Sequence, residues 1–260
     1  MDPGRLASDN AVPAGGSLAV GQTLVVRFPR QVHAVGPGET LSSIAAAYGT
    51  TVRQLWRNNW FLAGQETLAP GQTLVISYLE EKLGSALTNG YAYPYIEPGL
   101  LAEQLPYLTC LSPFTYGINA SGGLLPLEDD ELLSAARLRG TAPVMHLSTL
   151  TESGQFDTHR AELVLTDMAV QDQLVAEVIQ TVLRRGYAGV DVDFEFLPGQ
   201  LAAAYAAFLD RLRRRLQPQG RFLWAALAPK TSAGQRGLLY EGHDYAAVAA
   251  AADGVLLMTY

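Results

Sequence analysis

The segment 189–196 constrains the fold of this chain more than any other. It reads Gly-Val-Asp-Val-Asp-Phe-Glu-Phe, so that acidic and apolar residues alternate. Because the side chains of a β-strand point alternately to opposite faces, Asp191, Asp193 and Glu195 are predicted to share one face. The other face is then formed by four apolar residues: Val190, Val192, Phe194 and Phe196. The pattern therefore predicts a strand with one acidic face and one face suited to packing beneath helices.

The same three acidic residues also constrain the chemistry of this strand. Crowding carboxyl groups where water is partly excluded raises the free energy needed to ionise all of them. Such an arrangement is typical of sites that need a protonated carboxylic acid or that bind a metal ion. Carboxylates at alternate positions are also able to ligate Mg²⁺. A solvated strand edge is the remaining interpretation, and the apolar opposite face disfavours it.

The segment 86–260 alternates short apolar runs with longer helical patterns. The runs predict strands at 90–96, 107–116, 143–150, 189–197, 222–229 and 254–260. The clearest helical patterns lie between them, at 166–185 and 201–216. Strands that alternate with helices predict an α/β fold with a parallel sheet, of the (β/α)8 TIM-barrel type. A closed barrel needs eight strands and about 250 residues, so this segment predicts either an open sheet or an incomplete barrel cut from a longer chain.

The N-terminal part of the chain contains a repeat. Residues 18–26, Leu-Ala-Val-Gly-Gln-Thr-Leu-Val-Val, are echoed by residues 68–76, Leu-Ala-Pro-Gly-Gln-Thr-Leu-Val-Ile. The offset of roughly 50 residues is typical of tandem small modules. We expect residues 1–28 to be the second half of one module and residues 33–77 to be a complete copy. A linker is expected around residues 78–85.

The complete copy shows a βααβ pattern. Its elements are expected in the order strand 33–35, turn 37–38, helix 41–48, helix 52–58 and strand 73–77. Thr40 is placed to cap the first helix and Gly49 to end it. With Val-x-Pro-Gly-Glu-Thr-Leu-x-x-Ile-Ala at 35–45, the segment resembles the LysM module. The fold is thus expected to be a small α+β LysM module followed by the α/β domain.

LysM modules bind glycans that contain N-acetylglucosamine, such as peptidoglycan and chitin. The resemblance implies a shallow glycan groove, with Gly38, Glu39 and Thr40 and the segment from Asn59 to Leu62 lying near it. Gly38 and Thr40 also suit a turn and a helix cap, so a structural role is an equal alternative for them.

The acidic strand carries a second resemblance. Residues 188–195, Ala-Gly-Val-Asp-Val-Asp-Phe-Glu, are similar to the Asp-Gly-x-Asp-x-Asp-x-Glu motif of family 18 glycoside hydrolases, at the end of the fourth barrel strand. The resemblance implies that Glu195 is the catalytic general acid and that Asp193 and Asp191 are the two acids preceding it. Ala188 departs from the motif, because the family has an aspartate there that supports the acidic network.

This family also explains the spacing of the acids. Most glycosidases place two carboxylates on opposite sides of the sugar, which alternate residues of one strand cannot do. In family 18 the 2-acetamido oxygen of the substrate attacks C1 while the acid, Glu195 here, protonates the leaving oxygen. Asp193 would orient the acetamide N–H and Asp191 would tune Asp193. The resemblance implies no metal and no organic cofactor.

Three further motifs are similar to a narrower group, the LysM-bearing spore cortex-lytic N-acetylglucosaminidases. They lie at 89–94, 227–232 and 258–260. The resemblance implies that Tyr260 hydrogen-bonds the acetamido oxygen of the reacting sugar. The substrate-binding residues expected at strand ends are Tyr260, Tyr93, Asn89, Tyr116 and Met258.

Composition narrows the classes of partner. The net charge of −7 and the lack of a basic stripe disfavour nucleic acid. The single cysteine, Cys110, excludes an internal disulfide, and the four scattered histidines suggest no metal site. His146, in an apolar strand, is interpreted as a core histidine. No apolar stretch is long enough to span a membrane, and no signal peptide is recognisable.

The sequence therefore predicts a monomeric peptidoglycan hydrolase of the spore cortex or coat, or of the cell-wall surface, with a role in spore germination. Its substrate would be cortex or cell-wall glycan, and chitin oligosaccharides are an alternative. A non-catalytic glycan-binding protein with an incomplete barrel is the second hypothesis, favoured by Ala188 and by the missing strands. A metal-dependent enzyme that uses the three acids as ligands is the third.

Overall fold

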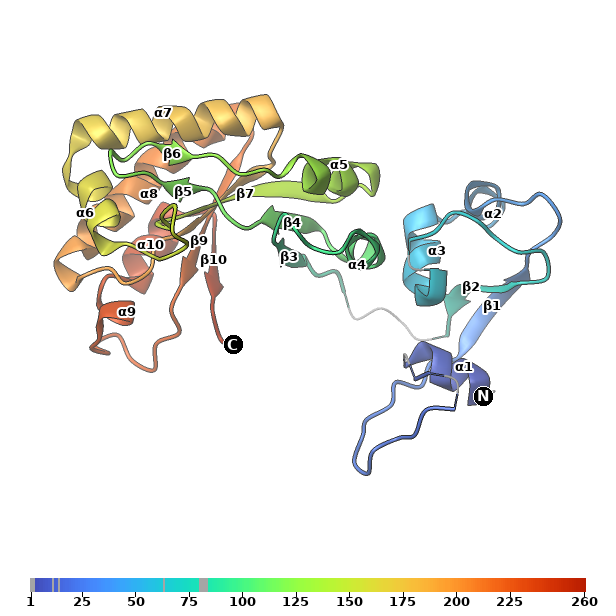
Figure 1. Cartoon of the computed structure of the whole chain (residues 1–260). Coiled ribbons are helices and arrows are strands. Elements are labelled where there is room, and N and C mark those ends of the chain that lie inside the picture. Colours follow the sequence, from blue (N-terminus) through green and yellow to red (C-terminus); the bar gives the residue numbers. More distant parts are fainter. Residues whose placement is uncertain (1–2, 11, 14, 63, 80–83) are drawn as a thin grey trace. The chain divides into compact units, whose positions relative to one another are not determined.

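The computed structural model describes residues 3–10, 12–13, 15–62, 64–79 and 84–260. The chain divides into two compact units (Figure 1). The first contains residues 1–88 and 96–108, and the second contains residues 89–95 and 109–260. Each unit has its own core of buried apolar side chains, so we describe each by itself.

The first unit contains the expected βααβ module. Strand β1 (Pro29–Ala34) pairs antiparallel with β2 (Thr73–Tyr78), and the helices α2 (Leu41–Ala47) and α3 (Val52–Asn58) lie between them in sequence. A short 3-10 helix, η1 (Trp60–Leu62), follows α3. The buried side chains that form its core are Val35, Leu41, Ile44, Ala45, Leu55, Trp56, Leu62, Leu74 and Ile76. The predicted order of elements is confirmed.

Local sequence explains where the two helices begin and end. Thr40 and Ser43 form a capping box, in which the Ser43 backbone N–H donates to Thr40 Oγ1 at 3.1 Å and the Thr40 N–H donates to Ser43 Oγ at 2.9 Å. Thr51 caps α3 by accepting from the Gln54 N–H at 3.1 Å. Gly49, with a φ of 63°, follows α2 in the left-handed conformation that glycine adopts most easily.

Asn59 ties the end of α3 to β2. Its amide nitrogen donates to the backbone oxygens of Leu55 (2.8 Å) and Val75 (2.9 Å), and its Oδ1 accepts from the Val75 N–H (2.7 Å). The side chain is completely buried. These three hydrogen bonds therefore join helix and strand inside the module.

The same three hydrogen bonds recur earlier in the chain, after α1 (Pro3–Asp9). The Asn10 amide nitrogen donates to the backbone oxygens of Leu6 (2.9 Å) and Val25 (2.8 Å), and Asn10 Oδ1 accepts from the Val25 N–H (2.6 Å). Val25 is exposed, however, and no β-strand is assigned to the described residues between α1 and β1. The repeat seen in the sequence thus extends to side-chain hydrogen bonding.

The first unit also takes in residues 96–108, which follow strand β3 (Asn89–Ala92) in the sequence. This segment contains α4 (Pro98–Gln104) and the 3-10 helix η2 (Leu105–Tyr107). Glu97 caps α4 by accepting from the N–H groups of Gly99 (2.8 Å) and Leu100 (2.6 Å). Pro98 at the first helical position loses no hydrogen bond there.

The second unit is built on one parallel sheet. Its strands follow the order β3 (Asn89–Ala92), β4 (Cys110–Pro113), β7 (Ala142–Ser148), β8 (Gly189–Asp193), β9 (Phe222–Leu227) and β10 (Gly254–Leu257). Every neighbouring pair is parallel. The six predicted strands and the α/β class are confirmed, and within the described residues β3 and β10 are the two edges of a curled, incomplete barrel. A short antiparallel hairpin, β5 (Gly117–Ile118) and β6 (Leu124–Leu125), interrupts the βα pattern.

Helices cover one side of this sheet (Figure 1). They are α5 (Asp130–Leu138), α6 (Thr158–Thr166), α7 (Met168–Arg185), α8 (Ala202–Leu216), α9 (Leu238–Glu241) and α10 (Tyr245–Ala251), with 3-10 turns η3 (Gly199–Leu201) and η4 (Gln217–Gln219). Asp167 caps α7, and Gly186, with a φ of 67°, ends it. None of the helices in the described part of the chain is long and apolar enough to cross a membrane.

The apolar residues of the acidic strand face these helices as expected, with one exception. Val190, Val192 and Phe194 are completely buried, and the Phe194 ring stacks on Tyr205 (5.7 Å) and Phe208 (5.4 Å) of α8. Phe196 is only partly buried, because β8 ends at Asp193 and the backbone of Phe196 adopts a φ of 55°. The expected strand to residue 197 was therefore too long.

Candidate active site

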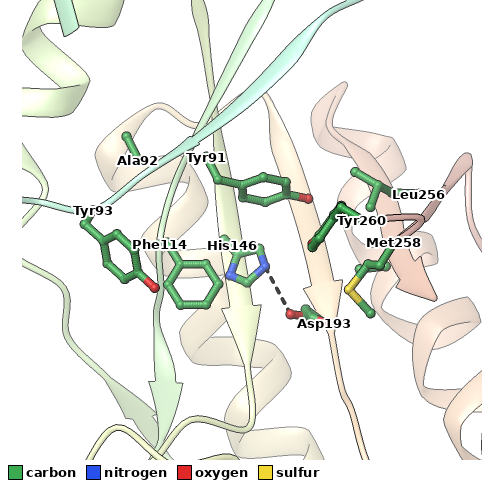
Figure 2. A pocket seen from close by; sticks show the side chains of 10 residues that line it. Tyr91, Ala92, Tyr93, Phe114, His146, Asp193, Leu256, Met258 and Tyr260 are labelled. Atoms are coloured by element: carbon green, nitrogen blue, oxygen red, sulfur yellow. Dashed lines mark ion pairs between the residues drawn. The ribbon is translucent and has the colours of Figure 1, made fainter. Parts of the chain in front are cut away.

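The carboxyl ends of the parallel strands surround a cavity of about 290 Å³ (Figure 2). Strands β3, β4, β7, β8, β9 and β10 or the residues that follow them all contribute side chains to it. The lining residues are Tyr91, Ala92, Tyr93, Phe114, His146, Asp193, Ala226, Leu256, Met258 and Tyr260. Binding sites of α/β folds lie at this end of the sheet, so the cavity is the candidate active site.

Asp191 lies deepest of the three acids of the motif. Its side chain is completely buried, and Oδ2 accepts a hydrogen bond of 2.5 Å from the hydroxyl of Tyr91 on β3. Burial raises the pKa of Asp191 from 3.8 to about 6, against the effect of the Tyr91 hydrogen bond, which favours the carboxylate. Tyr91, whose pKa is raised by burial and by Asp191, remains a hydrogen-bond donor.

Asp193 is the acid most difficult to ionise. Burial, and then the charges of Glu195 and Asp191, raise its pKa well above the usual value. One of its oxygens, Oδ1, is buried and has no hydrogen-bond partner among the described residues, and the same holds for Oδ1 of Asp191. Two neighbouring negative charges repel each other, so Asp191 and Asp193 together are expected to keep one proton at neutral pH.

Glu195 lies just beyond the end of β8 and is partly exposed. Burial raises its pKa above the usual value of a glutamate. A carboxyl group that keeps its proton towards neutral pH is able to protonate a leaving group. Glu195 combines this property with access to solvent, which the two buried aspartates lack.

His146 belongs to this site, although the sequence interpretation placed it in the core. It lies on β7 beside β8, where it pairs with Asp191 in the strand register, and its Nε2 is 3.6 Å from Asp193 Oδ2. Burial lowers the pKa of His146 to about 3, so the ring is neutral. A prediction that strand 142–148 pairs in parallel with the acidic strand could have placed His146 at the site, because the carboxyl ends of parallel neighbours lie at the same edge of the sheet.

Three of the five expected substrate-binding residues line the cavity. Tyr93 is half-exposed, Met258 faces the cavity, and Tyr260 is almost fully exposed (Figure 2). The pKa of Tyr260 is raised, first by partial burial and then by the charges of Asp193, Glu195 and Asp191. The tyrosine hydroxyl is thus a donor close to the acids.

The other two expected residues do not reach the cavity. Tyr116 is 2% exposed, lies in the main core and directs its hydroxyl to Asp129 Oδ2 at 3.2 Å. Asn89 is at the opposite, N-terminal end of β3, and its Oδ1 accepts from Ser112 Oγ at 3.2 Å. Asn89 lies away from the cavity because it is the first residue of β3, whereas the site lies at the other end of the strand. Substrate contact by these two residues stays a prediction.

The residues expected at the LysM groove have structural roles. Gly38 has a φ of 78°, and Thr40 caps α2. Glu39 Oε2 accepts from the Gly36 N–H at 2.6 Å and contacts His33 Nε2 at 2.7 Å, and these bonds lower the pKa of Glu39. Asn59 is completely buried and bonded within the module, and a glycan contact at this residue stays a prediction.

The described residues contain no cluster of three or more His, Cys, Asp or Glu side chains arranged to hold a metal ion. Asp191, Asp193 and Glu195 instead lie at alternate positions of the chain, where Tyr91 donates to Asp191 and His146 Nε2 is 3.6 Å from Asp193 Oδ2. Chemically, the arrangement offers carboxyl groups with raised pKa values beside an aromatic cavity.

Comparisons with known proteins agree with this geometry. The LysM domain family matches residues 33–77. The cortical fragment-lytic enzyme of Bacillus subtilis (strain 168) is 33% identical over a stretch covering 88% of this chain and 65% of its own length. The spore cortex-lytic enzyme SleL of Bacillus megaterium QM B1551 has a TM-score of 0.74 at 29% identity, covering 100% of this chain and 61% of SleL.

A chitinase from Chromobacterium violaceum ATCC 12472 is also similar in fold, with a TM-score of 0.60 at 23% identity over 67% of this chain and 56% of the chitinase. The chain spans less than two thirds of the length of these relatives.

Proposed function

We propose that this chain, which carries a LysM domain and is homologous to spore cortex-lytic enzymes, hydrolyses N-acetylglucosaminyl bonds of peptidoglycan. The observation that carries the proposal is the row of Asp191, Asp193 and Glu195 at the end of β8, beside an aromatic cavity and with raised pKa values. The resemblance to family 18 glycoside hydrolases expected from the sequence agrees with the homology and the fold.

The proposed reaction is substrate-assisted and retaining. Glu195 donates its proton to the glycosidic oxygen as the C1–O bond breaks, and the acetamido oxygen of the same sugar forms a new bond to C1. This yields an oxazolinium ion and frees the alcohol. Water then attacks C1 from the opposite face, Glu195 takes its proton, and the acetamide is restored. The configuration at C1 is therefore kept.

The buried aspartates act on the acetamide. Asp193 lines the cavity, so its carboxyl group is placed to accept from the acetamide N–H and to stabilise the positive charge that develops on that group. Asp191, held by Tyr91, sets the charge next to Asp193. Tyr260 is placed to donate to the acetamido oxygen, and Tyr93 and Met258 offer apolar contacts to the sugar.

The first unit holds the glycan. Residues 33–77 are the LysM module, and the loop that contains Gly38, Glu39 and Thr40 is its proposed contact surface. We further propose that residues 1–28 are half of a second LysM module, because Asn10 repeats the three hydrogen bonds of Asn59. The catalytic domain is proposed to extend from residue 86. Binding by the first unit would raise the local substrate concentration for the second.

The relatives suggest where the protein acts. We propose the spore cortex or coat, or the cell-wall surface, as its location and spore germination as its process. Independently of the relatives, we propose a monomer as the working form. Cortex or cell-wall glycan is the proposed substrate, and chitin oligosaccharides are the alternative.

The test compares the protein with its Glu195→Gln variant on purified spore peptidoglycan, with the B. subtilis relative as a positive control. New reducing ends are counted with and without EDTA. We expect EDTA to have no effect and Glu195→Gln to lower the rate by about 10² to 10⁴-fold, the usual contribution of a general acid. Binding to peptidoglycan without any turnover would favour the non-catalytic hypothesis, and loss of activity in EDTA would favour a metal enzyme.

A further inference from the structure

We propose that His146 is a positioning residue, which donates its Nε2–H to Asp193 Oδ2 and thereby sets the orientation of that carboxyl group towards the sugar. The proposal rests on the function proposed above. Strand β7 pairs with β8 in parallel, with Ser148 opposite Asp193 and His146 two pairs earlier, opposite Asp191. The two atoms are 3.6 Å apart (Figure 2). This distance is slightly longer than a hydrogen bond, and such contacts of unliganded enzymes often tighten in the substrate complex.

The imidazole ring is held on three sides. Phe114 stacks on it with ring centres 4.8 Å apart, and the Tyr91 ring meets it edge-on at 5.3 Å. On the side away from Asp193, Nδ1 contacts the hydroxyl of Thr115 at 2.6 Å. The ring is 1% exposed, so no rotation is open to it without moving these neighbours. This packing directs Nε2 at Asp193.

The proposal requires one of the two tautomers of His146. The neutral ring carries a single proton, on Nδ1 or on Nε2. The Thr115 hydroxyl has one hydrogen, and its contact with Nδ1 is shorter than those with the Tyr116 oxygen (3.1 Å), Ser148 Oγ (3.2 Å) and the His146 backbone oxygen (3.3 Å). When Thr115 donates to Nδ1, the ring proton is on Nε2. The proposal also places the proton kept by the two buried aspartates away from Asp193 Oδ2, so that this oxygen accepts from Nε2–H.

The two buried acids are then each held by a residue of another strand. Tyr91 of β3 donates to Asp191 at 2.5 Å, and His146 of β7 donates to Asp193. A carboxyl group anchored through one oxygen has a fixed plane, so its second oxygen has a defined direction. A fixed direction of the second Asp193 oxygen holds the acetamide N–H in one place. The acetamido oxygen is then aligned for attack on C1.

The first test reads the tautomer and needs no activity. The full chain is labelled with ¹⁵N-histidine, and the His146 signals are assigned by their loss in His146→Gln. We expect a protonated Nε2 and an unprotonated Nδ1, and in Thr115→Val a shift of the proton towards Nδ1. A protonated Nδ1 in the wild type would overturn the proposal, whether or not the protein hydrolyses glycan.

The second test separates positioning from packing. In His146→Gln the amide N–H is able to reach the place of Nε2, whereas the shorter His146→Asn reaches only the place of Nδ1. We expect kcat to fall by about 10-fold or more in His146→Asn, with KM within about threefold, and His146→Gln to keep kcat within about threefold of the wild type. Thermal unfolding of both variants is measured as the folding control. Equal losses of kcat in the two variants, with equal stability, would contradict a positioning role.

Discussion

Asn59 and Asn10 make the same three hydrogen bonds in different surroundings, and this allows a sharp prediction about stability. Asn59→Ala removes the partners of three backbone groups: the Leu55 oxygen, the Val75 oxygen and the Val75 N–H. Leu55 and Val75 are at most 1% exposed, so water does not replace these partners. At about 1 kcal/mol or more for each buried group left unpaired, the module should lose about 3 kcal/mol or more.

Asn10→Ala is the matched control, because it removes the equivalent three bonds around Leu6 and Val25. Val25 is 55% exposed, and water is able to take the place of the asparagine. We expect a loss below about 1 kcal/mol for this variant.

Hydrogen exchange, measured by mass spectrometry on the intact chain, compares the stability losses of Asn59→Ala and Asn10→Ala. A loss of about 3 kcal/mol speeds exchange through local opening by about a hundredfold in the peptide that contains β2. We expect this in Asn59→Ala alone, with exchange in the β8 peptide of the other unit unchanged. Equal protection of β2 in the two variants would refute the argument that burial, rather than hydrogen-bond number, sets the cost.

Two further variants test the acidic strand. Because Asp191 has a pKa of about 6 in the folded protein and 3.8 ordinarily, the folded state binds its proton more tightly, and stability should fall by up to about 3 kcal/mol as the pH rises from about 4 to about 6. Asp191→Asn should flatten this part of the profile in urea unfolding from pH 4 to 7.5, and a profile parallel to that of the wild type would contradict the raised pKa. Phe194→Ala should lower the free energy of unfolding by about 3 to 5 kcal/mol, because the completely buried ring stacks on Tyr205 and Phe208. A loss below about 1 kcal/mol in urea unfolding would show that this contact contributes little.

Much of the fold follows from periodicity in the sequence. The alternation of apolar runs and helical patterns predicted all six parallel strands, and cap residues such as Thr40 marked where helices begin. Strand ends were less predictable. β8 ends at Asp193, shortly before the chain turns at Phe196 with a positive φ. Nothing in the neighbouring sequence predicted this conformation.

Some residues of the candidate site were also unpredictable from local sequence. The three acids and Tyr260 were recognisable from their motifs, whereas His146 was not, since a lone histidine in an apolar strand resembles a core residue. Its place depends on which strand pairs with β8, which is a property of the sheet. The burial of Asn59 was equally hard to predict, because its hydrogen bonds to β2 depend on how α3 packs against that strand.

The most direct test of the central claim asks whether the acetamido group of the substrate takes part in the reaction. A chromogenic N-acetylglucosaminide is compared with analogues in which one, two or three fluorines replace hydrogens of the acetyl methyl group. Fluorine withdraws electrons from the acetamido oxygen and makes it a poorer nucleophile. We expect kcat/KM to fall steeply with each fluorine, and the product formed first to keep the configuration at C1. Equal rates along the series, or inversion at C1, would contradict a substrate-assisted mechanism in which Glu195 is the acid and Asp193 orients the acetamide.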